Sequence, residues 1–256
     1  MIMPARRILT ATVKKRRESH MLKKILKYFS PFEWALYGGG IAVITAGFLI
    51  GTERNVLSYV SALLGISCVI FNAKGSVWGQ IISIGFALTY AAFAYFNRYY
   101  GEMIIYLALM FPIHVASIFS WLKNKNSKAK HLEVKINTLS VREYVLAATG
   151  GAALTVGFYF LLRALNTDNL VVSTISLVTS LAAAYLMLRR CEYFSLCFVA
   201  NDIVLLVLWS MKMATDGISV LPSIISFCLY LLNDTYSFIS WKRIKRRQRL
   251  PEIDEP

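Results

Sequence analysis

The segment NVLSYVSALLGISCVIFNAKGSVW (residues 55–78) has a counterpart in NLVVSTISLVTSLAAAYLMLRRCEYF (169–194). Each is an apolar span that begins at an Asn and ends at a basic turn, and each is followed by two more apolar spans. The last of these ends in FSWLK (119–123) or ISWKR (239–243), so the offset is 114 residues at the first Asn and 120 at the final Trp. The pattern predicts two parallel three-helix units separated by one helix, related by an axis along the membrane normal.

The composition places these units in a membrane. Hydrophobic residues make up 57% of the 256 residues and charged residues only 16%, whereas soluble domains carry about 25% charged residues. The apolar runs do not alternate with period two, which excludes a β-barrel. We therefore predict an all-α polytopic membrane protein with spans long enough to cross about 30 Å of hydrocarbon. The expected spans are 34–51, 55–73, 77–97, 102–122, 143–165, 169–188, 193–213 and 218–241.

The repeat and the loops define the expected domain organisation. The two three-helix bundles occupy 55–122 and 169–243, and a loop with a linker helix (123–168) lies between them. The remaining parts are a basic N-terminal segment (1–33), an extra transmembrane helix (34–54) and a C-terminal tail (244–256).

Basic residues are distributed unequally between the two sides of the membrane. Twenty-four of the 28 Lys and Arg residues fall on the side shared by both termini, which predicts that both termini are cytoplasmic. The net charge of +14 is thus explained by topology and by contact with anionic lipid, rather than by nucleic-acid binding. Residues 1–33 form a long basic segment, and no small-residue cleavage site follows the first apolar run, so we expect no cleavable signal sequence.

Polar residues interrupt three of the apolar spans. Asn201 and Asp202 lie within one, Asn233 and Asp234 within another, and His114 within a third. Such residues are costly at the bilayer centre and mark substrate pathways, although helix–helix hydrogen bonds are the alternative interpretation. His114 and Asp234 each precede a Trp by seven residues, so both lie roughly 10 Å above the end of their helices.

These polar residues are expected to converge near the midplane, where alternating-access carriers hold their substrate. Neighbouring residues of a helix point about 100° apart, so only one member of each Asn-Asp pair can face a cavity directly. We expect Asn201 and Asp234 to be those members.

Aromatic and amide side chains supply further candidates. A flat heterocycle, above all a cationic one, would stack on Trp78, Tyr90 or Trp209, and Gln80 with Ser83 offers partners for sugar hydroxyls. The candidate substrate-binding residues are Trp78, Gln80, Tyr90, His114, Asn201, Asp202, Trp209, Asn233 and Asp234.

Motifs typical of enzymes are missing from the sequence. It contains no Walker-type loop, no HExxH and no Ser/His/Asp order. The four cysteines lack metal-ligand spacing and are interpreted as small buried hydrophobes. We therefore expect no catalytic residues, metal or cofactor. Two rivals to a carrier remain, namely a membrane enzyme using Asp202, Asp234 and His114 on a lipid-linked substrate, and a non-transporting scaffold.

Two stretches resemble a known family. NAKGSVWGQIISIGFALTYAAFAYFNRYYGEMIIYL (72–107) and ANDIVLLVLW…FCLYLLNDTYSFISWKR (200–243) are similar to the Pnu-type bacterial vitamin transporters, and the resemblance covers residues 55–243. It rests on the Trp-rich start of the third span, the YGE turn, the Asn of the seventh span and the Trp that ends each repeat.

The resemblance implies both an architecture and an activity. The fold would be a 3+1+3 arrangement like a full-length relative of the SWEET sugar transporters, with an extra N-terminal helix. The activity would be uptake of nicotinamide riboside across the bacterial inner membrane by facilitated diffusion, and a cytoplasmic nicotinamide riboside kinase would trap the nucleoside. The sequence leaves open whether the chain forms a homo-oligomer.

One position departs from the family pattern. Many members carry Trp-x-x-Trp at the start of the seventh span, where this chain has Phe194-Ser195-Leu196-Cys197. Either Phe194 and other aromatic residues hold the substrate, or the substrate is another vitamin such as thiamine or riboflavin.

Overall fold

The computed structural model describes residues 28–50, 55–96, 100–126, 133–167 and 169–249. Most of the predicted basic N-terminal segment and the end of the predicted tail lie outside these residues. The chain divides into two compact units, 1–39 and 40–256, which are considered separately. In the first unit, Ser30 and Glu33 form a capping box at the start of α2 (Pro31–Ile50), because each side chain accepts a hydrogen bond from the other residue's backbone N–H.

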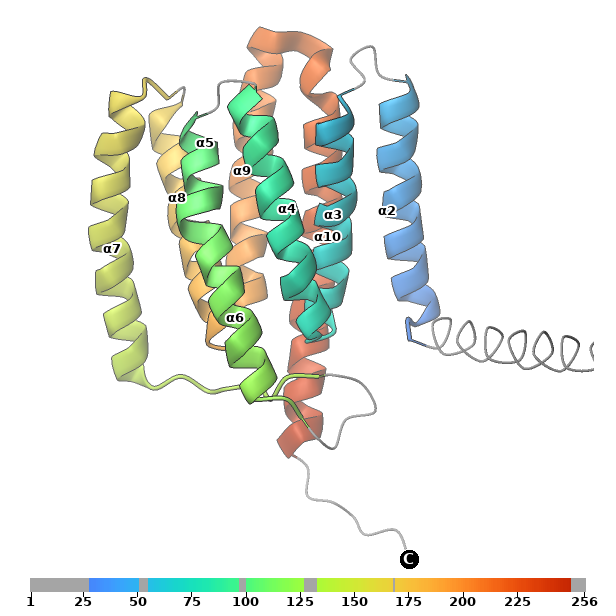
Figure 1. Ribbon diagram of the computed structural model, residues 1–256, viewed down its shortest axis with the longest axis vertical. Coiled ribbons are helices and arrows are strands. Elements are labelled where there is room, and N and C mark those ends of the chain that lie inside the picture. Colours follow the sequence, from blue (N-terminus) through green and yellow to red (C-terminus); the bar gives the residue numbers. More distant parts are fainter. Residues whose placement is uncertain (1–27, 51–54, 97–99, 127–132, 168, 250–256) are drawn as a thin grey trace, which may run out of the picture. The chain divides into compact units, whose positions relative to one another are not determined.

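The described residues are helical apart from two isolated β-bridges and the connecting turns, so the predicted all-α class is confirmed (Figure 1). Short elements interrupt or join the longer helices. The elements that follow α2 are α3 (Val56–Ala73), α4 (Val77–Phe96), α5 (Tyr100–Ile104), the π-helix η1 (Ile105–Met110), α6 (Phe111–Lys123), α7 (Val141–Ala164), α8 (Leu170–Leu188), α9 (Phe194–Asp216), the 3-10 helix η2 (Gly217–Val220) and α10 (Leu221–Arg249).

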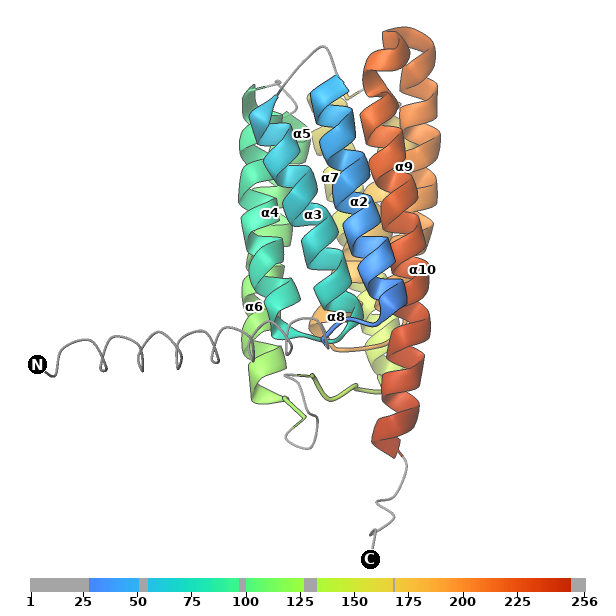
Figure 2. The same ribbon diagram turned by 90° about the vertical axis from the view of Figure 1, so that its right-hand side faces the viewer.

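Within the described ranges, seven helical stretches are long and apolar enough to cross a membrane. They correspond to the first seven predicted spans, the fourth of which is the continuous α5–η1–α6 stretch. The eighth predicted span begins in η2 and otherwise lies within α10, which the same criterion of length and composition does not select. Asn233, Asp234 and the basic C-terminal turns lower the apolar content of α10, which continues past Trp241 to Arg249. In Figure 2 its C-terminal end extends below α6.

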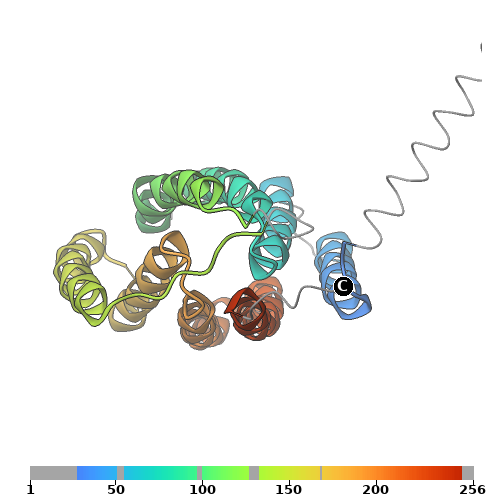
Figure 3. The same cartoon turned by 90° about the horizontal axis from the view of Figure 1, so that it is seen from below.

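Six helices of the second unit pack in a closed ring. Going round it, α3 contacts α4, α4 contacts α6, α6 contacts α8, α8 contacts α9, α9 contacts α10, and α10 returns to α3; α7 packs on the outside of α8. Seen along the helices in Figure 3, the teal and green helices α3, α4 and α6 form one arc, the first, and the orange and red helices α8, α9 and α10 form the facing, second arc. The interfaces between α3 and α10 and between α6 and α8 join the two arcs.

The turns that follow α3 and α8 have the same backbone geometry. Gly75 and Arg190 occupy the same place in them, with φ of 63° and 58°. In each turn this residue donates to the carbonyl three residues earlier, at 2.9 and 3.0 Å, and the next residue donates to the carbonyl five residues earlier, at 3.1 and 2.9 Å. Gly adopts positive φ without steric cost. Arg190 is held there by its guanidinium, which donates to the carbonyl and hydroxyl oxygens of Ser120.

Two tryptophans join the arcs at one end of the ring, which we call the tryptophan end. The indole of Trp121 on α6 donates to the carbonyl of Met187 on α8 at 3.0 Å, and that of Trp241 on α10 donates to the carbonyl of Asn72 on α3 at 2.8 Å. Both tryptophans are fully buried, and their ring centroids are 5.6 Å apart. Each indole therefore ties the last helix of one arc to the first helix of the other.

A segment before α7, residues 133–139, lies across the tryptophan end, and we call it the strap. Val134 N–H donates to the carbonyl of Gly75 at 3.0 Å, and Asn137 N–H donates to that of Arg190 at 2.9 Å. Val134 and Leu139 are buried in the same apolar cluster as the two tryptophans. The sequence indicated only a polar loop here, whereas the strap bonds to the matched turns of both arcs.

Candidate functional site

Two acidic residues of the second arc face each other inside the ring. Asp202 lies on α9 and Asp234 on α10, and they are only 4% and 5% exposed. Their carboxyl groups lie close together, and a hydrogen bond between two carboxyl groups requires a proton on one of them. Apart from this partner, no donor among the described residues reaches Oδ2 of Asp202. The pair thus retains unused capacity to accept a hydrogen bond or to face a cation.

Residues of α10 and α3 adjoin the acidic pair. Tyr230 lies one turn before Asp234, and its hydroxyl sits over Gly65 of α3, where a Cβ atom would come within 2.3 Å of that oxygen. The Cys68 thiol, one turn further along α3, donates to the carbonyl of Gly65 at 3.1 Å. Tyr230 interacts electrostatically with Cys68 and with both acids. The site therefore extends from the second arc to the first, and the glycine permits this close approach.

The first arc contributes a chain of uncharged polar residues. His114 of α6 is hydrogen-bonded through Nδ1 to Oε1 of Gln80 at 3.0 Å, and Nε2 of Gln80 donates to Oδ1 of Asn72 at 2.9 Å. Asn72 Nδ2 lies 3.4 Å from the hydroxyl of Ser83. All four residues are buried, and together they join α3, α4 and α6.

Aromatic rings lie near the acidic pair. Tyr90 of α4 packs against Tyr106 of η1 at 4.4 Å between centroids, and Phe86 lies 5.7 Å from both. Phe86 and the Tyr230 hydroxyl both lie against Gly65 of α3, where a Cβ atom would come within 3.4 and 2.3 Å of them. The aromatic cluster of α4 and η1 therefore adjoins Tyr230, one turn before Asp234, and aromatic faces near acids suit a flat cationic ring.

The structure brings several of the predicted site residues together. Asp202 and Asp234 form one pair, Gln80 and His114 another, and Tyr90 joins the aromatic cluster. Trp209 stacks on Phe227 at 6.4 Å with Lys212 over its ring, further along α9 from the acids.

The other three predicted residues are placed differently. Trp78 is 54% exposed on the outside of the ring. Oδ1 of Asn201 accepts hydrogen bonds from Ser176 and Thr179 of α8. We expected Asn201 to face the cavity, but it bonds to the neighbouring helix, and Asp202 meets Asp234 instead. Asn233 is fully buried, and neither polar atom of its side chain has a hydrogen-bond partner among the described residues.

Four residues of the site were not among the candidates. Asn72 is an amide within an apolar span, the same signal that selected Asn201, and Tyr230 precedes Asp234 by one helical turn. Cys68 and Tyr106 carry no comparable signal, because a thiol and a tyrosine in an apolar span are typical of ordinary packing.

Comparisons with known proteins place this geometry in a family. Residues 55–243 match the model of the nicotinamide mononucleotide transporter family. The chain belongs to this family. A curated relative from Neisseria mucosa, named nicotinamide riboside transporter PnuC, is 29% identical over 217 residues, which is 84% of this chain and 81% of the relative. A relative of the same name from Haemophilus influenzae is 24% identical over 198 residues, 77% of this chain and 84% of the relative.

A solved structure supports the fold. The crystal structure of the vitamin B3 transporter PnuC matches with a TM-score of 0.74 at 24% identity, covering 86% of this chain and 94% of the other. The chain is thus a multi-pass membrane protein of a transporter family and not an enzyme.

The position where many family members carry Trp-x-x-Trp lies at the tryptophan end. Phe194 is 1% exposed and packs edge-on against Trp241 at 4.7 Å, and Ser195 is hydrogen-bonded to Ser237 at 2.8 Å. Phe194 therefore belongs to the packed tryptophan end of the ring, and it lies about two turns of α9 away from Asp202. The rings next to the acids come from α4 and η1 instead.

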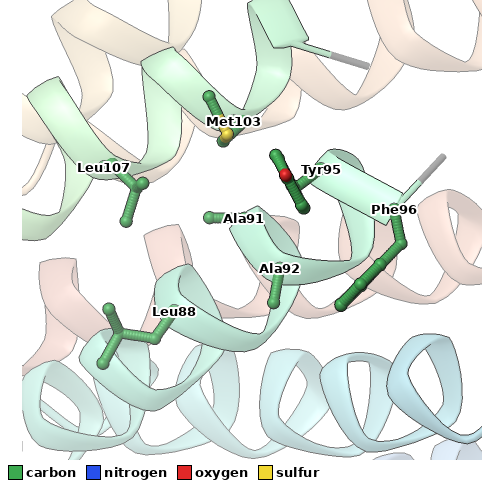
Figure 4. Close-up of a pocket in the computed structure, with 7 residues that line it drawn as sticks. All are labelled: Leu88, Ala91, Ala92, Tyr95, Phe96, Met103 and Leu107. Atoms are coloured by element: carbon green, nitrogen blue, oxygen red, sulfur yellow. The ribbon is translucent and has the colours of Figure 1, made fainter. Parts of the chain in front are cut away.

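A cavity of about 340 Å³ elsewhere in the second unit does not suit a polar ligand (Figure 4). It lies between α4 and the α5–η1 stretch. Several lining residues, including Leu88 and Phe96, are exposed on the outside of the ring. The lining is Leu88, Ala91, Ala92, Tyr95, Phe96, Met103 and Leu107. These side chains match lipid hydrocarbon, so the polar centre of the ring remains the candidate substrate site of this transporter.

Proposed function

We propose that the protein takes up nicotinamide riboside across the bacterial inner membrane by facilitated diffusion. The observation that carries this proposal is the buried pair of Asp202 and Asp234 beside the Tyr90–Tyr106 cluster. Nicotinamide riboside has a cationic pyridinium ring, a ribose and a carboxamide. The acids attract the cation, the aromatic faces stack on the ring, and the polar residues of the first arc bind groups that hydrogen-bond. The substrate names of the two relatives agree with this chemistry.

The charge of the site favours the nucleoside over its phosphate ester. A phosphate monoester carries a charge of about −1.5 to −2 at neutral pH. Its repulsion by one or two buried carboxylates is strong in a medium of low dielectric, so binding of the phosphate ester next to the acids is unfavourable. The family description names the mononucleotide, whereas the residues of this chain support the riboside as the transported form.

We propose the 3+1+3, SWEET-like arrangement for the transporting core, with three-helix bundles at 55–122 and 169–243. The matched turns at Gly75 and Arg190 and the reciprocal bonds of Trp121 and Trp241 support it. We place the tryptophan end and both termini in the cytoplasm, because most basic residues lie on that side. Parallel repeats of this kind hold the substrate between their bundles.

The direction of net transport would come from metabolism. A cytoplasmic kinase that phosphorylates the riboside would keep its free concentration low inside the cell, so inward flux would continue down the gradient. No residue of the proposed site is assigned to a cofactor or to a coupled ion.

Binding to purified protein tests the proposal. The protein should bind nicotinamide riboside and should bind nicotinamide mononucleotide at least tenfold more weakly. Thiamine and riboflavin are the rival ligands. Thiamine also has a cationic ring. Tight binding of thiamine without binding of the riboside would show that the protein is a vitamin transporter for thiamine and not for nicotinamide riboside. Binding of none of these ligands by protein that is folded and monodisperse would contradict the proposed function.

The acids supply a matched pair of variants. Asp202→Asn and Asp234→Asn keep the shape of the site, but each single variant leaves one carboxyl that can still carry the charge. The double variant removes the negative charge, so riboside affinity should fall at least tenfold in the double variant. Ser61→Ala is the control, because Ser61 is buried on α3 and its hydroxyl has no partner among the described residues. Unchanged affinity in the double Asn variant would rule out the acidic pair as the cation site.

A further inference from the structure

The polar chain of the first arc has a fixed hydrogen-bond direction. Its last member, the Ser83 hydroxyl, donates to the backbone carbonyl of Gly79 at 2.8 Å, and a carbonyl can only accept. Because the hydroxyl hydrogen is used there, the Ser83 oxygen accepts from Nδ2 of Asn72. Oδ1 of Asn72 is therefore directed to Gln80 and accepts from its Nε2.

The same direction determines the tautomer of His114. With its Nε2 donating to Asn72, Gln80 turns Oε1 toward the imidazole, 3.0 Å from Nδ1. That oxygen only accepts, so Nδ1 of His114 carries the hydrogen and donates it. A charged imidazole at the bilayer midplane costs several kcal/mol, so the ring is neutral and its Nε2 is a hydrogen-bond acceptor.

Two further features fit a ligand-binding role for this acceptor. His114 is buried in the middle of a membrane-spanning stretch, and among the described residues only Gln80 is hydrogen-bonded to its side chain, through Nδ1. It is the counterpart of Asp234, since both precede the Trp of their arc by seven residues. It also follows the π-helix Ile105–Met110 and Pro112, and π-helical turns are frequent at functional sites.

We propose that Nε2 of His114 accepts a hydrogen bond from the carboxamide NH₂ of the substrate and thereby selects the amide. This inference rests on the proposed function and assigns the ends of the ligand. The pyridinium and ribose lie toward Asp202 and Asp234, and the amide lies toward His114. A carboxylate in place of the amide would face an acceptor on one side and the acids on the other, so the acid form of the nucleoside is rejected.

Three ligands separate these interactions. Nicotinamide riboside is compared with 3-acetylpyridine riboside, in which a methyl group replaces the amide NH₂ and the ring charge is kept, and with nicotinic acid riboside. Wild-type protein should bind the amide at least tenfold more tightly than the acetyl analogue, because the analogue leaves Nε2 unpaired, and should bind the acid weakest of the three.

Variants of the polar chain test the assignment. In His114→Phe, nicotinamide riboside and the acetyl analogue should bind with equal affinity, because only nicotinamide riboside loses affinity relative to wild type. In Gln80→Leu the imidazole is kept but its tautomer is no longer fixed. The preference for nicotinamide riboside over the acetyl analogue should therefore decrease several-fold. Ser117→Ala, one turn from His114 and with a buried hydroxyl that has no partner among the described residues, should keep the full preference.

The outcomes distinguish this inference from the proposed function. Failure of wild-type protein to bind nicotinamide riboside would overturn both. Tight binding of the riboside with equal affinity for the acetyl analogue would overturn the His114 assignment alone. Equal weakening of both ligands in His114→Phe, with a lowered melting temperature, would show that His114 only supports the fold.

Discussion

The two arcs of the ring match at the tryptophan end and differ at the midplane. At the tryptophan end, Trp121 and Trp241 make the same type of indole-to-carbonyl bond, and Gly75 and Arg190 make the same turn. At the midplane, one arc carries the neutral His114 with its amide partners, whereas the other carries two acids.

This difference separates the residues that hold the ring together from those that select a ligand. The tryptophan end is buried and packed, and its indoles are hydrogen-bonded to the backbone, so its chemistry can be the same in both arcs. A ligand with a cation at one end and an amide at the other is not symmetric, so a site that binds it needs unlike groups on its two sides. The predictions below test this division.

The largest effect is expected at the tryptophan end. Trp241→Ala and Trp121→Ala each remove a fully buried indole and its bond between the arcs, which should lower stability by about 3–5 kcal/mol. Thermal unfolding in detergent measures the loss, and Trp34→Ala, outside the ring unit, is the control. A melting temperature within a degree of wild type in both variants would contradict the role given to this end.

Next in size is the contrast between Asp234 and Asn201. Asp234→Leu removes a charged partner of the ligand, so riboside affinity should fall at least tenfold. Asn201→Leu removes only hydrogen bonds to α8, worth about 0.6 kcal/mol each in membranes, so the protein should melt slightly earlier and bind normally. Titration beside ligand-free melting separates the two. If Asn201→Leu loses affinity as strongly as Asp234→Leu, then Asn201 belongs to the binding site.

A smaller effect is expected in the matched turns. Gly75→Ala places a Cβ on a residue with φ of 63°, without a close contact, so it should cost about 1–2 kcal/mol through the backbone alone. Arg190→Gly relieves the same strain but loses the bonds to Ser120, so the net change should be near zero. Melting temperatures of the two variants measure the difference. Equal losses in both would show that backbone strain does not distinguish the turns.

The smallest effect is expected at the strap. The side chain of Glu133 is only 9% exposed, but that of its partner Arg247 is 64% exposed, and ion pairs with an exposed partner contribute about 1 kcal/mol or less. Glu133→Gln keeps an oxygen that can accept the hydrogen bond from Gln248. Glu133→Gln should therefore lower the melting temperature only slightly, and high salt should reduce the difference from wild type. A large and salt-independent loss would show that the strap depends on this pair more than its exposure indicates.

Much of the fold could be predicted because hydropathy and repeat spacing are local signals. The seven-residue spacing before each Trp is enough to predict that His114 and Asp234 lie at equal depth. The spacing does not say where each side chain points. Asn201 turns to α8 because two hydroxyls lie there, and Trp78 faces outward. Nor could a sequence show that Tyr230 meets Gly65, because that contact joins helices far apart in the chain.

The central claim is that this ring carries a cationic nucleoside and excludes its phosphate ester. Uptake by proteoliposomes that contain the purified protein, without ATP or an ion gradient, tests it most directly. With the membrane potential held at zero, labelled nicotinamide riboside should equilibrate across the membrane, an imposed proton or Na⁺ gradient should not raise its final level, and labelled nicotinamide mononucleotide should stay outside. Entry of the mononucleotide at the same rate, or accumulation of the riboside above equilibrium under either gradient, would contradict the account.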